Sequence, residues 1–348
     1  MTAPTDIDGI LVHWGERLFY PGNRPVKALH PPRLSGGTGH RAAVIRARIH
    51  ATVVRRAPQV MVKVTGGGRG MAAIAAHLRY ITQSGRLPFE DDRGVVCEGK
   101  EELRELVDQW RYGGSFIDET TPHREAFNIM LSMPHGTDPL AVQRAAREFA
   151  EAELADHRYV MVLHDHQANP HVHISVRAES CHGERLNPRK ADLQRWRETF
   201  AERLRGWGID AEASRQASRG QIRRYEPLWR IKAAEEHRLT KPRETMKSSA
   251  RSERSRQEAV FAWVQISRAL ADSEVAEDRA LADSIARYVR NSPYGLEYAR
   301  RLRGQRETGR REPDGPQLDF EFPTQEVSAP AQAVTAHSPG KQIGHDRR

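Results

Sequence analysis

Two short runs of alternating residues, joined across an Asn-Pro step, constrain this chain more than any other feature. The first run, residues 159–164, ends at His164, and the second, residues 171–176, carries His171 and His173 on one face, because side chains alternate along a strand. If the runs pair as a hairpin, His164 lies opposite His171, where facing Cβ atoms are about 4.5–5.5 Å apart, with His173 on the diagonal. The pattern therefore predicts three imidazoles that converge on one metal ion.

A simpler interpretation of these histidines has to be weighed. An H-x-H pair by itself is more often an exposed half-strand or a chance match than a metal site. A third histidine before a tight turn, on the matching face of a β-branched run, favours the metal site. Structural zinc sites normally close with a fourth Cys or His ligand. Three ligands with an open position fit catalysis better.

Composition and charge limit the class of protein. The chain has 348 residues, a formal net charge of +9, a sequence pI near 9.8 and a mean hydropathy of −0.71, which suits a polyanionic partner. Cys97 and Cys181 form no C-x-x-C motif, so a reducing compartment is the default. No apolar run approaches the ~20 residues of a membrane helix, and the N-terminus lacks a signal-peptide pattern. These features predict a cytoplasmic protein without membrane insertion.

Changes in composition and in hydrophobic pattern divide the chain into four parts. Residues 1–58 are expected to be a basic, mostly irregular arm, with at most one short helix near 41–54. Residues 59–225 have the alternation and helical stripes of a folded domain. Residues 226–304, rich in Arg, Glu and Ala, predict a charged helical extension, and residues 305–348 predict a disordered tail.

The folded part alternates strands and helices. The expected elements are a strand at 60–64, a helix at 71–84, a short strand within 91–97, a helix at 100–110, a strand at 126–133, a helix at 139–154, the histidine hairpin, and a helix from 188 to 206 or 208. This order predicts an α+β fold, with one sheet and helices on a face.

Residues 65–70 form a glycine-rich segment between the first strand and the first helix. Its backbone N–H groups could approach a phosphate, as glycine nests do. A plain strand-to-helix turn explains the segment at least as well. The segment does not match G-x-x-x-x-G-K-[ST], which argues against a nucleotide triphosphatase or a fused helicase.

A metal beside a basic surface suggests phosphodiester chemistry, in which a tyrosine can be the nucleophile. A phenol ionises near pH 10 and its phenolate leaves readily in the reverse step. Among eight tyrosines, Tyr80 lies on the first predicted helix, off the stripe that includes Ile74 and Leu78. From periodicity alone, Tyr80 is more simply a residue flanking the core. Tyr112 and Tyr159 are the substitutes.

Three segments of the chain carry a family resemblance. They read H-L-R-Y-I-T-Q-S-G-R-L at 77–87, N-I-M-L-S-M-P-H-G-T at 128–137 and H-D-H-Q-A-N-P-H-V-H at 164–173. In this order they resemble the three motifs of relaxases, the mobilisation nucleases that nick plasmid or T-DNA at a transfer origin. The likeness is to the Vir/Mob-type branch with one catalytic tyrosine, and it covers residues 59–225, roughly half of the chain.

The resemblance implies a fold and a set of roles. It implies an HUH-relaxase-like α+β domain, with an antiparallel-type central sheet and helices packed on it, followed by a helical C-terminal extension. Tyr80 would be the nucleophile, and His164, His171 and His173 would bind the metal, with His164 also catalytic. Ser132 lies in the middle motif, near bound DNA in the family. Further candidate DNA contacts are Arg69, His77, Arg79 and Arg86, although any single arginine is as simply a solvated one.

The third motif departs from the family pattern at one place. Asp165 and His166 stand where relaxases have an unspecified residue followed by an aspartate. Both are therefore candidates for the group that orients a metal ligand or acts as general base. Glu125 is a further candidate for that acidic partner.

The resemblance also implies cofactor and partners. Three imidazoles favour zinc or another transition ion, whereas relaxases imply magnesium or manganese, and manganese fits both. The expected partners are single-stranded or hairpin DNA at a transfer origin, relaxosome accessory proteins and a type IV coupling protein. The product would be a 5′-phosphotyrosyl protein and a free 3′-OH, and the bacterial cytoplasmic protein would then be exported while joined to DNA.

Two other functions stay open at the level of sequence. One is a non-catalytic DNA-binding mobilisation accessory protein, in which the swapped Asp165 and His166 mark a decayed site. The other is a three-histidine metal oxygenase or hydrolase of a small molecule. A Tyr80→Phe change separates the second from a relaxase, because only a relaxase needs the phenol.

Overall fold

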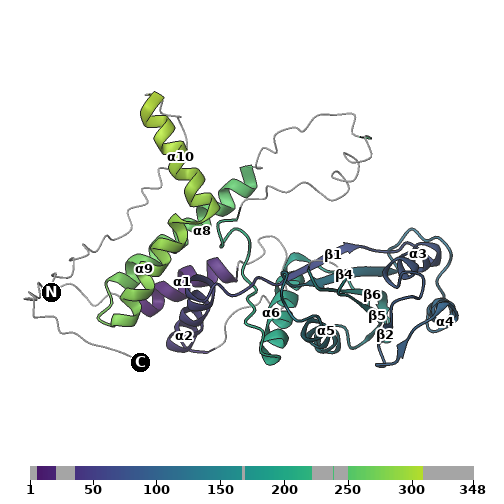
Figure 1. Cartoon of the computed structure of the whole chain (residues 1–348). Coiled ribbons are helices and arrows are strands. Elements are labelled where there is room, and N and C mark those ends of the chain that lie inside the picture. The colour runs from purple at the N-terminus through teal and green to yellow at the C-terminus, as the bar shows by residue number, and fades with distance from the viewer. Residues whose placement is uncertain (1–5, 21–35, 167–168, 222–237, 239–249, 309–348) are drawn as a thin grey trace, which may run out of the picture.

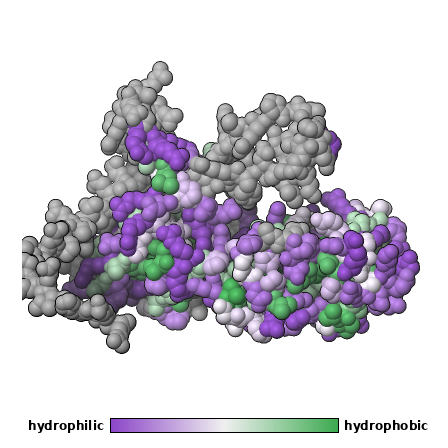
Figure 2. Space-filling view, in the orientation of Figure 1, coloured by the Kyte–Doolittle hydropathy of each residue, from purple (hydrophilic) through white to green (hydrophobic). Residues whose placement is uncertain are grey.

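The computed structural model describes residues 6–20, 36–166, 169–221, 238 and 250–308. Figure 1 shows two parts side by side, a sheet covered by helices and a group of helices from both ends of the chain. None of the helices in these ranges is both long and apolar enough to cross a membrane. On the face in Figure 2, hydrophilic residues cover most of the described surface and hydrophobic ones form small separate patches.

The sheet has six strands, and every pairing in it is antiparallel. The strands are β1 (Met61–Gly66), β2 (Phe89–Asp91), β3 (Val96–Cys97), β4 (Ala126–Ser132), β5 (His157–His164) and β6 (His171–Ser180). Their order across the sheet is β1-β4-β6-β5-β2-β3, so the two long strands of the histidine hairpin lie at its centre. The antiparallel α+β fold expected from the sequence is confirmed.

Helices cover both faces of this sheet, rather than one face as expected. α5 (Pro139–Glu153) and α6 (Lys190–Gly206) bury the larger apolar face. α3 (Met71–Ile81) and α4 (Lys100–Tyr112) cover part of the other. Two-sided burial follows from the sequence of the hairpin, because β5 directs valines toward α3 and α4 while β6 directs its apolar residues toward α5 and α6.

A second hydrophobic core joins the two ends of the chain. It is built from α1 (Ile7–Phe19), α2 (Thr38–Ile49), the π-helix η1 (His50–Val54), α8 (Ala250–Ala271) and α9 (Ala276–Arg290), with α10 (Pro293–Thr308) continuing the chain. α1 packs along α8 in Figure 1, although more than 200 residues separate them in sequence. Helices over 226–304 were expected, and α8 to α10 are such helices; residues 309–348 lie outside the described residues.

The expectation of a mostly irregular arm over residues 1–58 is wrong. Asp6 caps α1 by accepting the backbone N–H of Gly9 at 2.9 Å, and Leu11, Leu18 and Phe19 are buried. This spacing is that of an amphipathic helix. The stripe packs against α2 and also against α8, and α8 follows the sheet domain in the sequence.

One buried arginine connects the two parts. The Nη1 of Arg48 on α2 donates to Oε1 of Glu198 on α6 at 3.0 Å, and its Nε donates to Oε1 of Glu212 at 3.1 Å. The guanidinium carbon also lies 4.8 Å and 4.6 Å from the ring centroids of Phe19 and Tyr20. A planar guanidinium can bond carboxylates in its plane and stack on rings above it. Arg48 therefore fixes the helical part against α6.

Candidate active site

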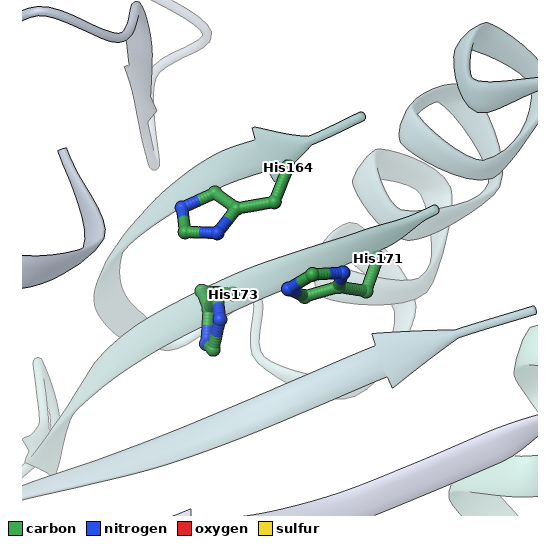
Figure 3. A group of neighbouring side chains, drawn as sticks. All are labelled: His164, His171 and His173. Carbon is green, nitrogen blue, oxygen red and sulfur yellow. The ribbon is translucent and has the colours of Figure 1, made fainter. Parts of the chain in front are cut away.

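The three histidines converge as the strand pattern predicted. His164 pairs with His171 across β5 and β6, and His173 is opposite Val162, two residues along. The ring centroids lie 5.1 Å apart for His164 and His171, 4.7 Å for His164 and His173, and 5.0 Å for His171 and His173. Figure 3 shows the three rings turned toward one another from two neighbouring strands. One nitrogen of each lies within 4.8 Å of the others.

Two backbone carbonyls set the orientation of these rings. The Nε2–H of His164 donates to the carbonyl oxygen of Ile81 at 2.7 Å, and the Nδ1–H of His171 donates to that of Asn169 at 2.9 Å. These bonds leave Nδ1 of His164 and Nε2 of His171 as lone-pair nitrogens. Nδ1 of His164 and of His173 are also buried without a hydrogen-bond partner. Buried, unpaired nitrogens around one point are the donor set a metal ion would satisfy.

Burial keeps the imidazoles in the form that binds metals. It lowers the pKa of His173 to about 3, helped by the neighbouring His164 and His171. Burial also lowers the pKa of His164, although the hydrogen bond to Ile81 opposes that shift. A buried cation is disfavoured in surroundings of low dielectric constant. These two rings are neutral near pH 7, as metal ligation requires.

The expected acidic partner of the cluster is absent from its described surroundings. Asp165 is exposed, and so is His166, whose ring centroid lies 5.2 Å from that of His164. Glu125 is bonded to Arg185 at 3.0 Å, next to the other end of β4. Glu125 is seven positions from Ser132, which lies beside His171, and seven positions span about 23 Å of strand. Glu125 therefore cannot orient these ligands. The backbone carbonyls of Ile81 and Asn169 orient the rings instead, and no residue type marks such a carbonyl in the sequence.

Tyr80 lies on α3 one residue before the carbonyl that holds His164. Its side chain is 69% exposed, so it does not belong to the core. Its ring centroid is 6.3 Å from that of His77, and the His77 ring is in turn 6.4 Å from that of His173. α3 thus presents an accessible phenol, and His77 is a ring neighbour of both Tyr80 and His173.

The two substitute tyrosines have different surroundings. Tyr159 is buried on β5, and burial raises the pKa of its phenol to about 12. Tyr112 is 66% exposed at the end of α4, where its ring lies 5.9 Å from that of Phe116. Neither ring makes a ring contact with the three histidines among the described residues.

The candidate DNA contacts fall into two groups. Arg69, Arg79 and Arg86 are exposed, at either end of α3. His77 is half-buried, and Ser132 is buried opposite His171, where its hydroxyl donates to the carbonyl of Pro170 at 3.3 Å. The arginines are accessible to a ligand. Ser132 instead holds the turn before His171.

The glycine-rich segment is a packed turn rather than an open cradle. The N–H of Gly68 donates to the carbonyl of Ala126 at 3.1 Å, and the first N–H groups of α3, at Met71 and Ala72, donate to the carbonyls of Asp118 and Glu119. Gly70 has φ of +97°, and a Cβ there would lie 2.3 Å from the Glu119 oxygen. Because these donors are already used, the plain-turn interpretation is the one supported.

Comparison with known families decides which class of site this is. Residues 93–209 match the family model described as "Relaxase: MobA/VirD2-like, nuclease domain". The chain carries a MobA/VirD2-like relaxase nuclease domain. The matched range includes the three histidines of the relaxase domain and Ser132, whereas Tyr80 precedes it.

Three curated relatives of the relaxase domain are T-DNA border endonucleases named VirD2. The protein of Agrobacterium fabrum is 26% identical over 182 residues, that of Rhizobium radiobacter 25% over 182, and that of Rhizobium rhizogenes 26% over 183. Each alignment covers 47% of this chain and 41%, 43% and 42% of the respective relative. The chain thus spans about two fifths of the length of the relatives it matches. They establish a distant homology of the nuclease domain.

Proposed function

We propose that this chain is a relaxase that cuts one DNA strand at a transfer origin by tyrosine transesterification. The observation that carries the proposal is the connection between the exposed phenol and the histidine cluster through consecutive residues of α3. Tyr80 presents its hydroxyl to solvent, and the carbonyl of Ile81 bonds His164 at 2.7 Å. One helix end would therefore supply the nucleophile and orient a metal ligand, which supports the proposal.

Tyr80 would be the nucleophile of the reaction. The phenol of Tyr80 gives up its proton to a base, its oxygen attacks the scissile phosphorus and a Tyr–O–P bond forms. The P–O3′ bond breaks, and the leaving 3′ oxygen takes up one proton to become a hydroxyl. The product is a 5′-phosphotyrosyl protein and a free 3′-OH. The phosphodiester energy is retained in the new ester, so the reverse attack can reseal a strand.

His164, His171 and His173 would hold a divalent metal in this proposal. When bound, the metal supplies Lewis-acid polarisation of the scissile phosphate and stabilises the charge that develops on it. Three imidazoles fit manganese or zinc better than magnesium, which prefers oxygen ligands. Arg69, Arg79 and Arg86 are proposed to contact the DNA backbone, together with the half-buried His77. The buried Ser132 would act on the DNA only indirectly, by holding the turn at Pro170, and Asp165 and His166 remain candidates for a general base.

The partners and the fate of the product belong to the same proposal. The substrate would be single-stranded or hairpin DNA at a transfer origin, assembled with relaxosome accessory proteins. A type IV coupling protein would then receive the protein joined to its DNA, and export would begin in a bacterial cytoplasm. The domain division at residues 59–225 is likewise proposed.

A gel assay tests the nucleophile. The full chain is incubated with Mn²⁺ and labelled single strands of candidate transfer origins, and a denaturing gel reports a protein–DNA adduct. We expect the adduct with the natural protein and with Tyr112→Phe, which removes an equally exposed phenol, and its loss in Tyr80→Phe. Loss in Tyr112→Phe instead would refute the assignment to Tyr80. Cleavage without any adduct would indicate a hydrolytic nuclease, and binding without cleavage an accessory protein.

A further inference from the structure

A cleft of about 530 Å³ lies where the relaxase domain meets the C-terminal helices. It is lined by Lys190 at the start of α6, by Arg215, and by Ala250, Arg254, Ser255 and Glu258 of α8. The cleft is separate from the histidine cluster. Its walls come from both parts of the molecule.

The basic residue deepest in the cleft is an arginine with spare hydrogen-bonding capacity. Nη2 of Arg215 donates to the carbonyls of Arg17 at 3.0 Å and Leu18 at 3.3 Å, at the end of α1. Its Nε is buried and has no partner. Burial lowers the pKa of Arg215 to about 10, although the nearby carboxylate of Glu258 opposes that shift and Arg197 adds to it. A buried guanidinium with an unused donor is a costly arrangement that an anion would relieve.

The charges around the cleft are unbalanced. Lys190, Arg215 and Arg254 are cationic, and Glu258 is the one carboxylate among the lining residues. Within the described parts of the chain, no carboxylate lies within ion-pair distance of these three cations. Lys190 and Arg254 are exposed, so their charges can meet a ligand from solution. The cleft therefore favours a ligand with more than one negative charge.

The cleft lies at the same end of the sheet as the histidines. The N–H of Val60 donates to the carbonyl of Glu212 at 3.1 Å, three residues before Arg215. The next residue, Met61, begins β1 opposite Ser132, which is opposite His171. Two strand spacings, about 10 Å, separate Met61 from His171. The histidines face α3 and α4, whereas the cleft lies beside α6, so a DNA strand held in the cleft would pass around the β1 edge of the sheet to reach the cluster.

We propose that this cleft binds backbone phosphates of the DNA strand flanking the cleavage site. The inference rests on the proposed relaxase function and adds a second contact region to it, shared between α6 and α8. The cleft volume of about 530 Å³ is several times that of a few water molecules, which occupy about 30 Å³ each. The cleft therefore has room for a chain of phosphates, which fits it better than one free phosphate. It also presents cations from two separate walls. Arg215 would supply the fixed donor, and Lys190 and Arg254 the mobile ones.

The test is DNA binding by the full chain, measured apart from cleavage. Fluorescence anisotropy of a labelled single strand is recorded in EDTA over a series of salt concentrations. The variant Lys190→Gln/Arg254→Gln leaves Arg215 in place, because Arg215 also holds the end of α1. The control Lys100→Gln/Arg104→Gln removes the same charge from exposed positions on α4. Circular dichroism melts verify that both variants fold.

We expect the cleft variant to bind DNA roughly tenfold more weakly at low salt, and its slope of log K against log salt to fall by about 1.4, or about 0.7 per lost contact. The control variant should bind like the natural protein. Equal DNA binding by both variants would overturn the proposal that the cleft binds DNA. The Tyr80 adduct could still form in that case, so this failure is distinct from failure of the relaxase proposal. Specific, cleft-dependent binding of inorganic phosphate with unchanged DNA affinity would assign the site to a free phosphate group and also overturn it.

Discussion

The Nε2–H of His164 donates to the carbonyl oxygen of Ile81 at 2.7 Å, which links the centre of the sheet to the last turn of α3. Tyr80 is the residue immediately before Ile81. A metal-ligating imidazole commonly donates its second N–H to an outer partner that fixes the ring. Here that partner is the main chain of the helix that carries the proposed nucleophile, so the ring orientation and the place of the phenol are not independent.

Removing one imidazole should remove most of the metal affinity. We expect His171→Ala to weaken Mn²⁺ binding by more than the roughly 10- to 100-fold typical of changing an outer partner, because the change deletes one of three ligands. Isothermal titration calorimetry measures the affinity. His166→Ala is the control, because His166 is exposed and outside the cluster of converging nitrogens. Equal losses in the two variants would contradict the three-histidine assignment.

The start of α3 depends on a glycine. Gly70→Ala places a Cβ 2.3 Å from the Glu119 oxygen at a φ of +97°, so we expect a loss of about 3 kcal/mol or more in the free energy of unfolding. Gly94→Ala has φ of +77° but no atom within 4 Å, and should cost only about 1 kcal/mol. Urea unfolding measures both. Similar values would mean that the contact with the 118–120 segment does not hold α3.

The buried Arg48 should be essential for joining the two parts. Arg48→Met leaves Glu212 buried, and Glu198 partly so, without their cation, so we expect a loss of about 3–5 kcal/mol in the free energy of unfolding. Arg55→Met removes an exposed pair with Asp210, worth at most about 1 kcal/mol. Guanidinium unfolding of both variants makes the comparison. An Arg48→Met protein as stable as Arg55→Met would mean that the two parts are not held by this network.

Tyr159 should make folding sensitive to alkali. Burial raises its folded-state pKa to about 12, above the ordinary value near 10. A raised pKa means that the contribution to stability is complete below pH 10 and is lost as the pH rises toward 12, because the unfolded chain ionises first. Unfolding free energies measured from pH 9 to 12 should fall more steeply for the natural protein than for Tyr159→Phe. Tyr112→Phe, which removes an exposed phenol, should follow the natural curve.

The histidine site was predictable because strand periodicity is local. Alternation along 159–164 and 171–176 fixes which side chains share a face, and a short turn fixes the pairing of His164 with His171. The position of Tyr80 outside the core followed in the same way from the apolar stripe of α3. Both inferences need only neighbouring residues and the fixed geometry of a strand or a helix.

The orienting groups of the site could not be predicted from side-chain types. The sequence suggested Asp165, His166 or Glu125, whereas the carbonyls of Ile81 and Asn169 hold the rings. Every residue has a carbonyl group, so no residue type marks the ones that act. Only the packing of α3 against the end of β5 determines that Ile81 is the partner.

The sequence by itself determined the local elements of this protein: the hairpin, the face of each histidine and the helix that exposes Tyr80. The tertiary structure decided the long-range matters. In the folded chain the apolar stripe of α1 packs against α8, and Arg48 bonds to Glu198 and Glu212. Lys190 and Arg254 line one cleft. The physical reason is that period and propensity act over a few residues, whereas these contacts join residues tens to hundreds of positions apart and form only when the whole chain is packed.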